Sequence, residues 1–281
     1  MILFNKLLCM KFSTKWTPNL PKHKIIFDKD HYHQPHPAWD IESAKDVQIT
    51  HKPPSNFKDK FAFYVMKFLR KSFDLISGYR PGKMNENQYL RRCIFLETIA
   101  GLPGMIGGMS RHLRSLRGLK EDGGWIHHLL EEAENERMHL LFFLKLRMPG
   151  YFMRFCIMYS QFIFIFYYSI LYALSPTTAH RFVAYLEEEA VKTYSSIIDD
   201  IDNGNLPKWK EMPADETYIR YWGLSKDAKI RDVLISIRAD EANHREYNHH
   251  FANIPKDEPI HKHEEIHFFD SKNMDEVFRY K

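Results

Sequence analysis

Two Glu-x-x-His pairs constrain the fold more than any other feature of this sequence. They are Glu136-Arg-Met-His139 and Glu241-Ala-Asn-His244. Residues three apart share one face of an α-helix, so each pair can present a carboxylate and an imidazole to the same metal site. Four-helix bundles that bind two metal ions use two such pairs and one further glutamate from each of two other helices. The pairs therefore predict four helices around a shared centre.

Glu97 and Glu187 are the candidates for the two further glutamates. The intervals along the chain from Glu97 to Glu136, on to Glu187 and on to Glu241 are 39, 51 and 54 residues. Each interval accommodates the rest of one helix, a connection and part of the next helix. The spacing therefore fits an all-α, ferritin-like four-helix bundle.

Periodicity separates the two selected pairs from three others in this histidine-rich chain. The selected pairs lie on otherwise apolar helical stripes, where an unpaired charge would be very costly to bury and a metal ion would remove that cost. The three other pairs lie on polar or proline-interrupted stretches and are interpreted as solvated; they are Glu246/His249, Glu258/His261 and Glu264/His267.

Other acidic residues have simpler interpretations. Glu97 taken alone can be the partner of Arg92 in an ion pair. The run Glu187-Glu188-Glu189 is by itself typical of a solvated helix face. The same interpretation is preferred for the acids just before Glu136, which are Glu131, Glu132 and Glu134.

Oxygen and nitrogen ligands in this mixture suit iron or manganese. Two iron ions can each change oxidation state by one, which suits activation and reduction of oxygen. Three cysteines far apart, Cys9, Cys93 and Cys156, argue against a disulfide framework or a thiolate zinc site. A net charge of only +4 gives no reason to expect nucleic-acid binding.

The helical patterns run over residues 57–79, 85–110, 123–148, 151–175, 177–202 and 226–251. Residues 28–56 are expected to form an irregular arm, whose histidines His31, His33 and His36 are interpreted as solvated. The first 27 residues carry five lysines and no acid, which fits either an organelle-targeting segment or an ordinary basic arm. We expect three regions: the arm at 1–56, the helical domain at 57–251 and a tail at 252–281.

Two helices are expected at a membrane interface. Residues 57–79 form a basic amphipathic helix. Residues 151–174 contain one charge, Arg154, and are long enough to span a bilayer. A span would separate Glu136 from Glu187, which belong to one site, so we expect this helix to run beside the bundle or half-sunk in one leaflet.

The stretches that carry these residues resemble the alternative oxidases. The matching motifs are LETIAGLPGM at 96–105, NERMHL at 135–140, AHRFVAYLEEEAVKTY at 179–194 and RADEANHR at 238–245. The resemblance implies a monotopic homodimer on the matrix side of the mitochondrial inner membrane, or in a mitochondrion-related organelle. It also implies a non-proton-pumping terminal oxidase that oxidises ubiquinol and reduces O2 to water at two iron ions.

The resemblance also implies roles for individual residues. The iron ligands would be Glu97, Glu136, His139, Glu187, Glu241 and His244, with Tyr194 as a redox-active tyrosine beside them. Asn135 and Asp240 would hold the ligands by hydrogen bonds, and Tyr221 and Trp222 would belong to the same network or simply pack as aromatics. The quinol pocket would comprise Arg70, Asp74, Arg92, Leu96, His180, Leu186, Glu189 and Thr193.

Two alternatives remain at this stage. One is a related di-iron enzyme, a quinone-ring hydroxylase or a desaturase. The other is a ferritin-like iron protein or membrane scaffold without quinol turnover.

Overall fold

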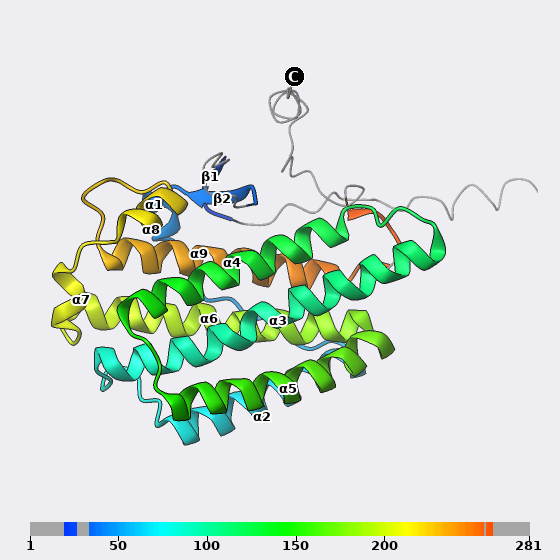
Figure 1. Cartoon of the computed structure of the whole chain (residues 1–281), viewed down its shortest axis with the longest axis horizontal. Helices are drawn as coiled ribbons and strands as arrows, with labels where there is room; N and C mark the ends of the chain where they lie inside the picture. The colour runs from blue at the N-terminus through cyan, green and yellow to red at the C-terminus, as the bar shows by residue number, and fades with distance from the viewer. Residues whose placement is uncertain (1–19, 27–33, 256, 261–281) are drawn as a thin grey trace, which may run out of the picture.

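The computed structural model describes residues 20–26, 34–255 and 257–260 and confirms the all-α class (Figure 1). The first 19 residues of the expected targeting segment lie outside this range, as do His31, His33, His261 and the pair Glu264/His267. The helices are α1 (Ile41–Ala44), α2 (Phe57–Ser77), α3 (Glu86–Gly118), α4 (Trp125–Leu146), α5 (Tyr151–Leu174), α6 (Pro176–Asp202), α7 (Pro207–Glu211), α8 (Glu216–Tyr221) and α9 (Ile230–Phe251).

Four long helices, α3, α4, α6 and α9, form the bundle (Figure 1). α3 packs along α4 and α6 packs along α9, while α2 lies against α6, and α5 lies against α3 and α6. The four bundle helices are those predicted to carry metal ligands. Their pairing brings residues far apart in the sequence to the middle of one bundle.

Glycines allow α3 and α4 to approach closely. A Cβ added at Gly104 would lie 2.4 Å from the carbonyl oxygen of Leu129 and 3.1 Å from the amide nitrogen of Ala133. Since real Cβ atoms do not approach backbone atoms so closely, only glycine fits at this crossing. The glycine-rich part of α3 therefore sets the distance between the two helices.

Most helix ends agree with the sequence, because capping residues mark them. Asn85 and Gln88 form a capping box at the start of α3, and Gly78 ends α2 with φ +63°. The predicted end of α3 at residue 110 was wrong: the helix continues to Gly118. Arg111 explains the extension, because it donates to Asp122 Oδ1 at 2.9 Å and fixes the last turns against the start of α4.

Two stretches outside the predicted helical ranges contain regular structure. The strands β1 (His23–Ile26) and β2 (His36–Trp39) pair antiparallel, and α1 follows them. β2 is buried because His36 stacks on Tyr221 with ring centroids 3.8 Å apart, so its interpretation as a solvated histidine was wrong. The stretch between α6 and α9 holds the short helices α7 and α8. Tertiary contacts rather than periodicity stabilise these elements.

Within the described residues, α3 and α5 are long and apolar enough to cross a membrane. Only 11% of the apolar window of α5 is buried, against 44% for α3, which is a helix of the bundle core. α5 runs along the outside of the bundle, at the lower edge of Figure 1, as the shared metal site requires. Its exposed face carries large apolar side chains, among them Phe152, Phe155, Phe162, Phe166 and Tyr167.

Candidate metal centre

The six predicted ligands meet in the middle of the bundle. Glu97 comes from α3, Glu136 and His139 from α4, Glu187 from α6, and Glu241 and His244 from α9. None of the six is more than 6% exposed. Four helices therefore deliver carboxylates and imidazoles to one buried place, as the Glu-x-x-His spacing predicts.

His139 lies among three of the carboxylates. Its Nδ1 is 3.6 Å from Oε2 of Glu97, 3.4 Å from Oε2 of Glu136 and 3.4 Å from Oε1 of Glu241. These four residues each offer one ligand atom, and the atoms all lie within 4.8 Å of one another. Nδ1 of His244 lies 2.7 Å from Oε1 of Glu136.

Unpaired polar atoms show that a metal fits here. Buried oxygen and nitrogen atoms nearly always have a hydrogen-bond partner, because leaving one unpaired costs free energy. Each of the six residues nevertheless has a buried atom with no hydrogen bond of good geometry: Glu97 Oε2, Glu136 Oε1 and Oε2, His139 Nδ1, Glu187 Oε2, Glu241 Oε2 and His244 Nδ1. The 2.7 Å contact between His244 Nδ1 and Glu136 Oε1 has the distance of a hydrogen bond but not its orientation. Coordination of metal cations would satisfy these atoms together.

Electrostatics support the same conclusion. Burial raises the pKa of Glu97 to about 8 and that of Glu187 well above its ordinary value, and neighbouring carboxylates add to both shifts. Burial acts to raise the pKa of Glu136, but the two histidines outweigh it and lower this pKa. Burial acts to lower the pKa of His244, but Glu136 outweighs it and raises this pKa to about 9. Cations at the centre would stabilise all the carboxylates in their charged form.

Asp240 connects the centre to surrounding donors. Its Oδ2 lies 3.0 Å from Nε2 of His139 and accepts from the indole of Trp222 at 2.8 Å and from Asn135 at 3.3 Å. Asn135 also donates to the Tyr221 hydroxyl. The sequence did not predict Trp39, whose indole donates to Asp240 Oδ1 at 2.6 Å from the arm. Only the tertiary structure brings this tryptophan near the centre.

Tyr194 contacts the centre directly. Its hydroxyl donates to Oε1 of Glu97. Burial and the Glu97 charge raise the pKa of Tyr194 well above its ordinary value, so the phenol stays protonated. The alternative prediction that Glu97 forms an ion pair with Arg92 was wrong. Arg92 instead binds Asp74 and donates to the Ser77 hydroxyl at 2.9 Å.

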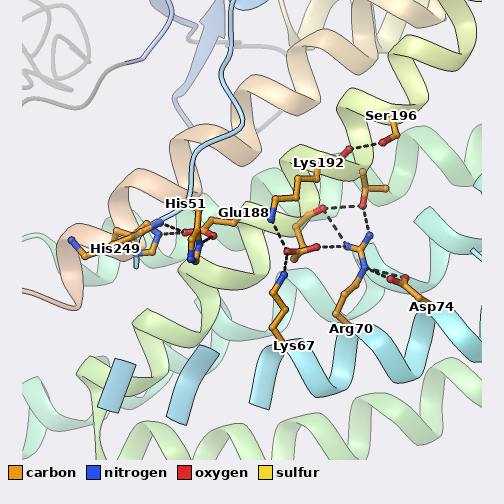
Figure 2. Close-up of polar contacts among 11 residues, drawn as sticks. His51, Lys67, Arg70, Asp74, Glu188, Lys192, Ser196 and His249 are labelled. Carbon is orange, nitrogen blue, oxygen red and sulfur yellow. Dashed lines mark hydrogen bonds and ion pairs between the residues drawn. The ribbon is translucent and has the colours of Figure 1, made fainter. Parts of the chain in front are cut away.

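Three consecutive glutamates on α6 have three different environments. Glu187 faces the metal centre, whereas Glu188 points toward His51 and His249 (Figure 2). Glu188 is 2% exposed and its carboxylate lies 2.6 Å from Nδ1 of His51 and 2.9 Å from Nε2 of His249. Glu189 accepts from the ammonium group of Lys67 at 2.7 Å.

Several acids and one histidine interpreted as solvated are in fact buried. These are Glu188, Glu131, Glu132 and His249 of the rejected Glu246/His249 pair. His249 binds Glu188 and Arg181 and is no metal ligand. The arm and neighbouring helices cover these positions. Helical periodicity alone cannot reveal burial by segments that are distant in the sequence.

A cavity of about 740 Å³ reaches the metal centre between α2, α3, α5 and α6. Glu97, Glu187, Glu241 and Tyr194 form part of its wall, and apolar side chains form most of the rest. Five predicted quinol-pocket residues also line it: Arg70, Leu96, Leu186, Glu189 and Thr193. Asp74 and Arg92 lie directly behind Arg70. His180 is not in the wall; its Nδ1 lies 3.0 Å from Oδ1 of Asn248.

A family model described as "Alternative oxidase" matches residues 39–253. The chain belongs to the alternative oxidase family. All six candidate ligands, Tyr194 and the residues around Asp240 fall within the matched range.

Curated relatives support this membership. Three proteins named "Alternative oxidase, mitochondrial", from Ajellomyces capsulatus, Monilinia fructicola and Emericella nidulans, are 49%, 47% and 46% identical to this chain. The matches cover 78%, 80% and 78% of this chain and 65%, 69% and 65% of the relatives, respectively. The chain therefore spans just under two thirds of the length of two of these alternative oxidases.

Proposed function

We propose that this alternative oxidase family member is a membrane-bound, non-proton-pumping terminal oxidase that oxidises ubiquinol and reduces O2 to water at a di-iron centre. One observation carries the proposal. The 740 Å³ apolar cavity has carboxylates of three candidate metal ligands and the Tyr194 side chain in its wall. An apolar cavity with a few polar groups suits a quinol, and it ends where a redox metal would be held.

Polar groups at the α2–α6 side of the cavity can orient the quinol hydroxyls. Arg70 donates to Asp74, to the Glu189 carbonyl at 3.2 Å and to the Thr193 hydroxyl at 3.1 Å (Figure 2). This network holds the guanidinium at the cavity wall beside the Glu189 carboxylate. We propose that Arg70, Glu189 and Thr193 bind the headgroup, with Leu96 and Leu186 against the ring and Asp74 and Arg92 supporting Arg70. His180, outside the wall, would act only indirectly.

The donor set of four carboxylates and two imidazoles suits two iron ions, which would supply the one-electron steps for quinol oxidation and O2 reduction. The chain's own residues would hold the ions, exclude bulk water and keep a protonated phenol at Glu97. Two ubiquinols release four electrons and four protons, and one O2 consumes the same numbers to form two waters. The reaction balances without moving protons across a membrane.

The exposed apolar face supports attachment to one leaflet. α2 exposes Phe57, Phe61, Phe68, Leu75 and Ile76, α5 exposes its aromatic face, and both helices line the quinol cavity. Attachment through these helices would let a lipid-dissolved quinol enter from the bilayer. We propose that the protein lies on the matrix side of the inner membrane of a mitochondrion or related organelle, and the name "Alternative oxidase, mitochondrial" of the relatives supports the organelle alone. We also propose a homodimer, since α3 exposes Met105, Met109, Leu113 and Leu116; the mass of the detergent-solubilised protein tests this.

The decisive test is oxygen uptake in a host that lacks its own terminal oxidases. The chain should support uptake that depends on ubiquinol and resists cyanide. Glu136→Ala and His244→Ala should each abolish it, and full activity in both variants would refute the site. A quinone hydroxylase or desaturase would instead yield a hydroxylated or desaturated product that mass spectrometry detects.

The cavity can be tested separately from the metal centre. Ala190 lines the cavity, so Ala190→Phe should obstruct it and raise the KM for ubiquinol about 10-fold or more while iron content is unchanged. Ala173→Phe, on the exposed face of α5, is the matched control. An unchanged KM in Ala190→Phe would show that quinol enters elsewhere.

A further inference from the structure

A second, small cavity touches the metal centre from the α4–α9 side. Its volume is about 20 Å³, and Glu132, Asn135, Asn243 and His244 are among the residues that line it. The large apolar cavity has none of these four residues in its wall. The small cavity is therefore a distinct, polar space beside one of the candidate ligands.

The cavity has the size and the partners that one water molecule needs. A buried water requires a space of about 10–15 Å³ and two or more polar partners. The amide oxygens Oδ1 of Asn135 and Asn243 are buried without a hydrogen bond, and the two side chains are 4% and 7% exposed. A water in this cavity would satisfy polar atoms that otherwise have no partner.

The two candidate histidine ligands differ in what supports them. His139 directs Nδ1 at the carboxylates and Nε2 at Asp240, 3.0 Å away. Nδ1 of His244 likewise lies close to a carboxylate, 2.7 Å from Oε1 of Glu136, so Nε2 lies farther from Glu136, and the residue borders the small cavity. Metal-binding histidines nearly always donate their second ring nitrogen to a carboxylate, a carbonyl or a water. His244 thus lacks the direct carboxylate that His139 has.

Of the three carboxylates that line this space, Glu131, Glu132 and Asp240, Glu132 is the one bonded to a side chain that also contacts the His244 backbone. It is 7% exposed, and its Oε2 accepts from the Asn248 amide at 2.9 Å. The same amide lies 3.0 Å from the backbone oxygen of His244. Asn248 therefore holds Glu132 in a fixed position relative to His244. Glu132 lies on α4, one turn before the candidate ligand Glu136.

We propose that the small cavity binds one water molecule that joins Nε2 of His244 to the Glu132 carboxylate, and that Glu132 is thereby a positioning residue for the metal centre. The inference rests on the proposed di-iron centre. Through the water, Glu132 orients the imidazole of His244, as Asp240 orients the imidazole of His139 by direct contact. Both imidazoles are then oriented by a buried carboxylate.

Iron affinity of the full chain, measured anaerobically by chelator competition, tests the proposal. Glu132→Gln keeps the size of the side chain and its contact with Asn248 but removes the carboxylate charge, so affinity should fall about 10-fold or more. Asn243→Leu should fill the cavity, displace the water and cause a similar loss. Since both act through one water, the double variant should lose no more than the larger single loss. Glu134→Gln, on the same helix and paired with the exposed Arg137, should leave affinity unchanged.

A second readout distinguishes positioning from general damage. In the zinc-loaded chain, ¹⁵N NMR of labelled histidine should show a changed Nε2 resonance for His244 in Glu132→Gln and in Asn243→Leu, and an unchanged one for His139. Native affinity and resonances in Glu132→Gln, or fully additive losses in the double variant, would overturn the proposal. If Glu132→Gln loses helicity, Asn243→Leu decides alone by the same criteria. A native chain that binds no iron would refute the metal centre as well, whereas native iron binding without these effects refutes only the role of Glu132.

Discussion

Nε2 of His139 lies 3.0 Å from Oδ2 of Asp240, while Nδ1 of the same ring faces the carboxylates of Glu136 and Glu241. This arrangement fixes the orientation of the imidazole and keeps a proton on Nε2, because the Asp240 carboxylate accepts from it, so Nδ1 is the nitrogen that a metal would bind. Trp39, Trp222 and Asn135 donate to Asp240 and keep its carboxylate in place.

Asp240→Asn should lower iron affinity about 10- to 100-fold, because an amide cannot accept all of these hydrogen bonds and no longer attracts the His139 proton. Chelator competition measures the change. Asp202→Asn, which removes a surface partner of Arg231, is the matched control and should bind iron like the native chain. Equal affinity in the two variants would contradict a role for Asp240 in holding His139.

Tyr194→Phe should reduce ubiquinol oxidation about 100-fold or more and leave iron content unchanged, because it removes only the hydroxyl that donates to Glu97. Oxygen uptake and iron analysis of the same sample provide the two measurements. Tyr185→Phe is the control on the same helix, since Tyr185 packs against His51 and Phe63 instead. Near-native turnover in Tyr194→Phe would remove this phenol from the reaction.

Gly104→Ala should lower the free energy of unfolding by about 1–3 kcal/mol, because the new methyl group would lie 2.4 Å from the Leu129 carbonyl oxygen and force α3 away from α4. Chemical denaturation followed by circular dichroism measures the loss. Gly118→Ala, where the nearest atom is 3.9 Å away, should change stability little. The same small effect at both positions would mean that the helices separate without cost.

The metal-free chain should become less stable as pH rises from about 7 to 8, above the range in which the lowered pKa values of His128 and His180 act in the opposite direction. Burial raises the pKa of Glu97 to about 8 in the folded chain, above its ordinary value of 4.5. Between these values the folded chain keeps a proton that the unfolded chain has released, so the free energy of unfolding falls with rising pH. The raised pKa of His139 acts in the same direction above pH 6.5.

Thermal unfolding at several pH values, after removal of metal by a chelator, tests this dependence. Glu97→Gln removes one of the titrating groups, so the decline should become weaker but should not vanish, because His139 still contributes. Bound iron should reduce the decline by stabilising the charged carboxylates. An identical pH dependence in the native chain and in Glu97→Gln would contradict the assignment.

Local spacing was enough to predict the bundle and the six residues at its centre. Glu136/His139 and Glu241/His244 could be chosen from five Glu-x-x-His pairs because apolar neighbours at helical intervals implied burial. The same reasoning failed for Glu132 and Glu188, whose charged neighbours suggest a solvent-facing surface although other elements cover them. Burial that depends on a distant segment leaves no periodic pattern in the sequence.

The sequence by itself determined the long helices, because capping residues and apolar periodicity act within a few residues, and it determined which helices must share a metal site. Only the tertiary structure decided what surrounds that site. Trp39 reaches Asp240 from 201 positions away, and Asn248 reaches Glu132 from 116. Such contacts depend on how the packed helices and the arm meet in space. Sequence patterns over a few neighbouring residues therefore cannot predict these hydrogen bonds.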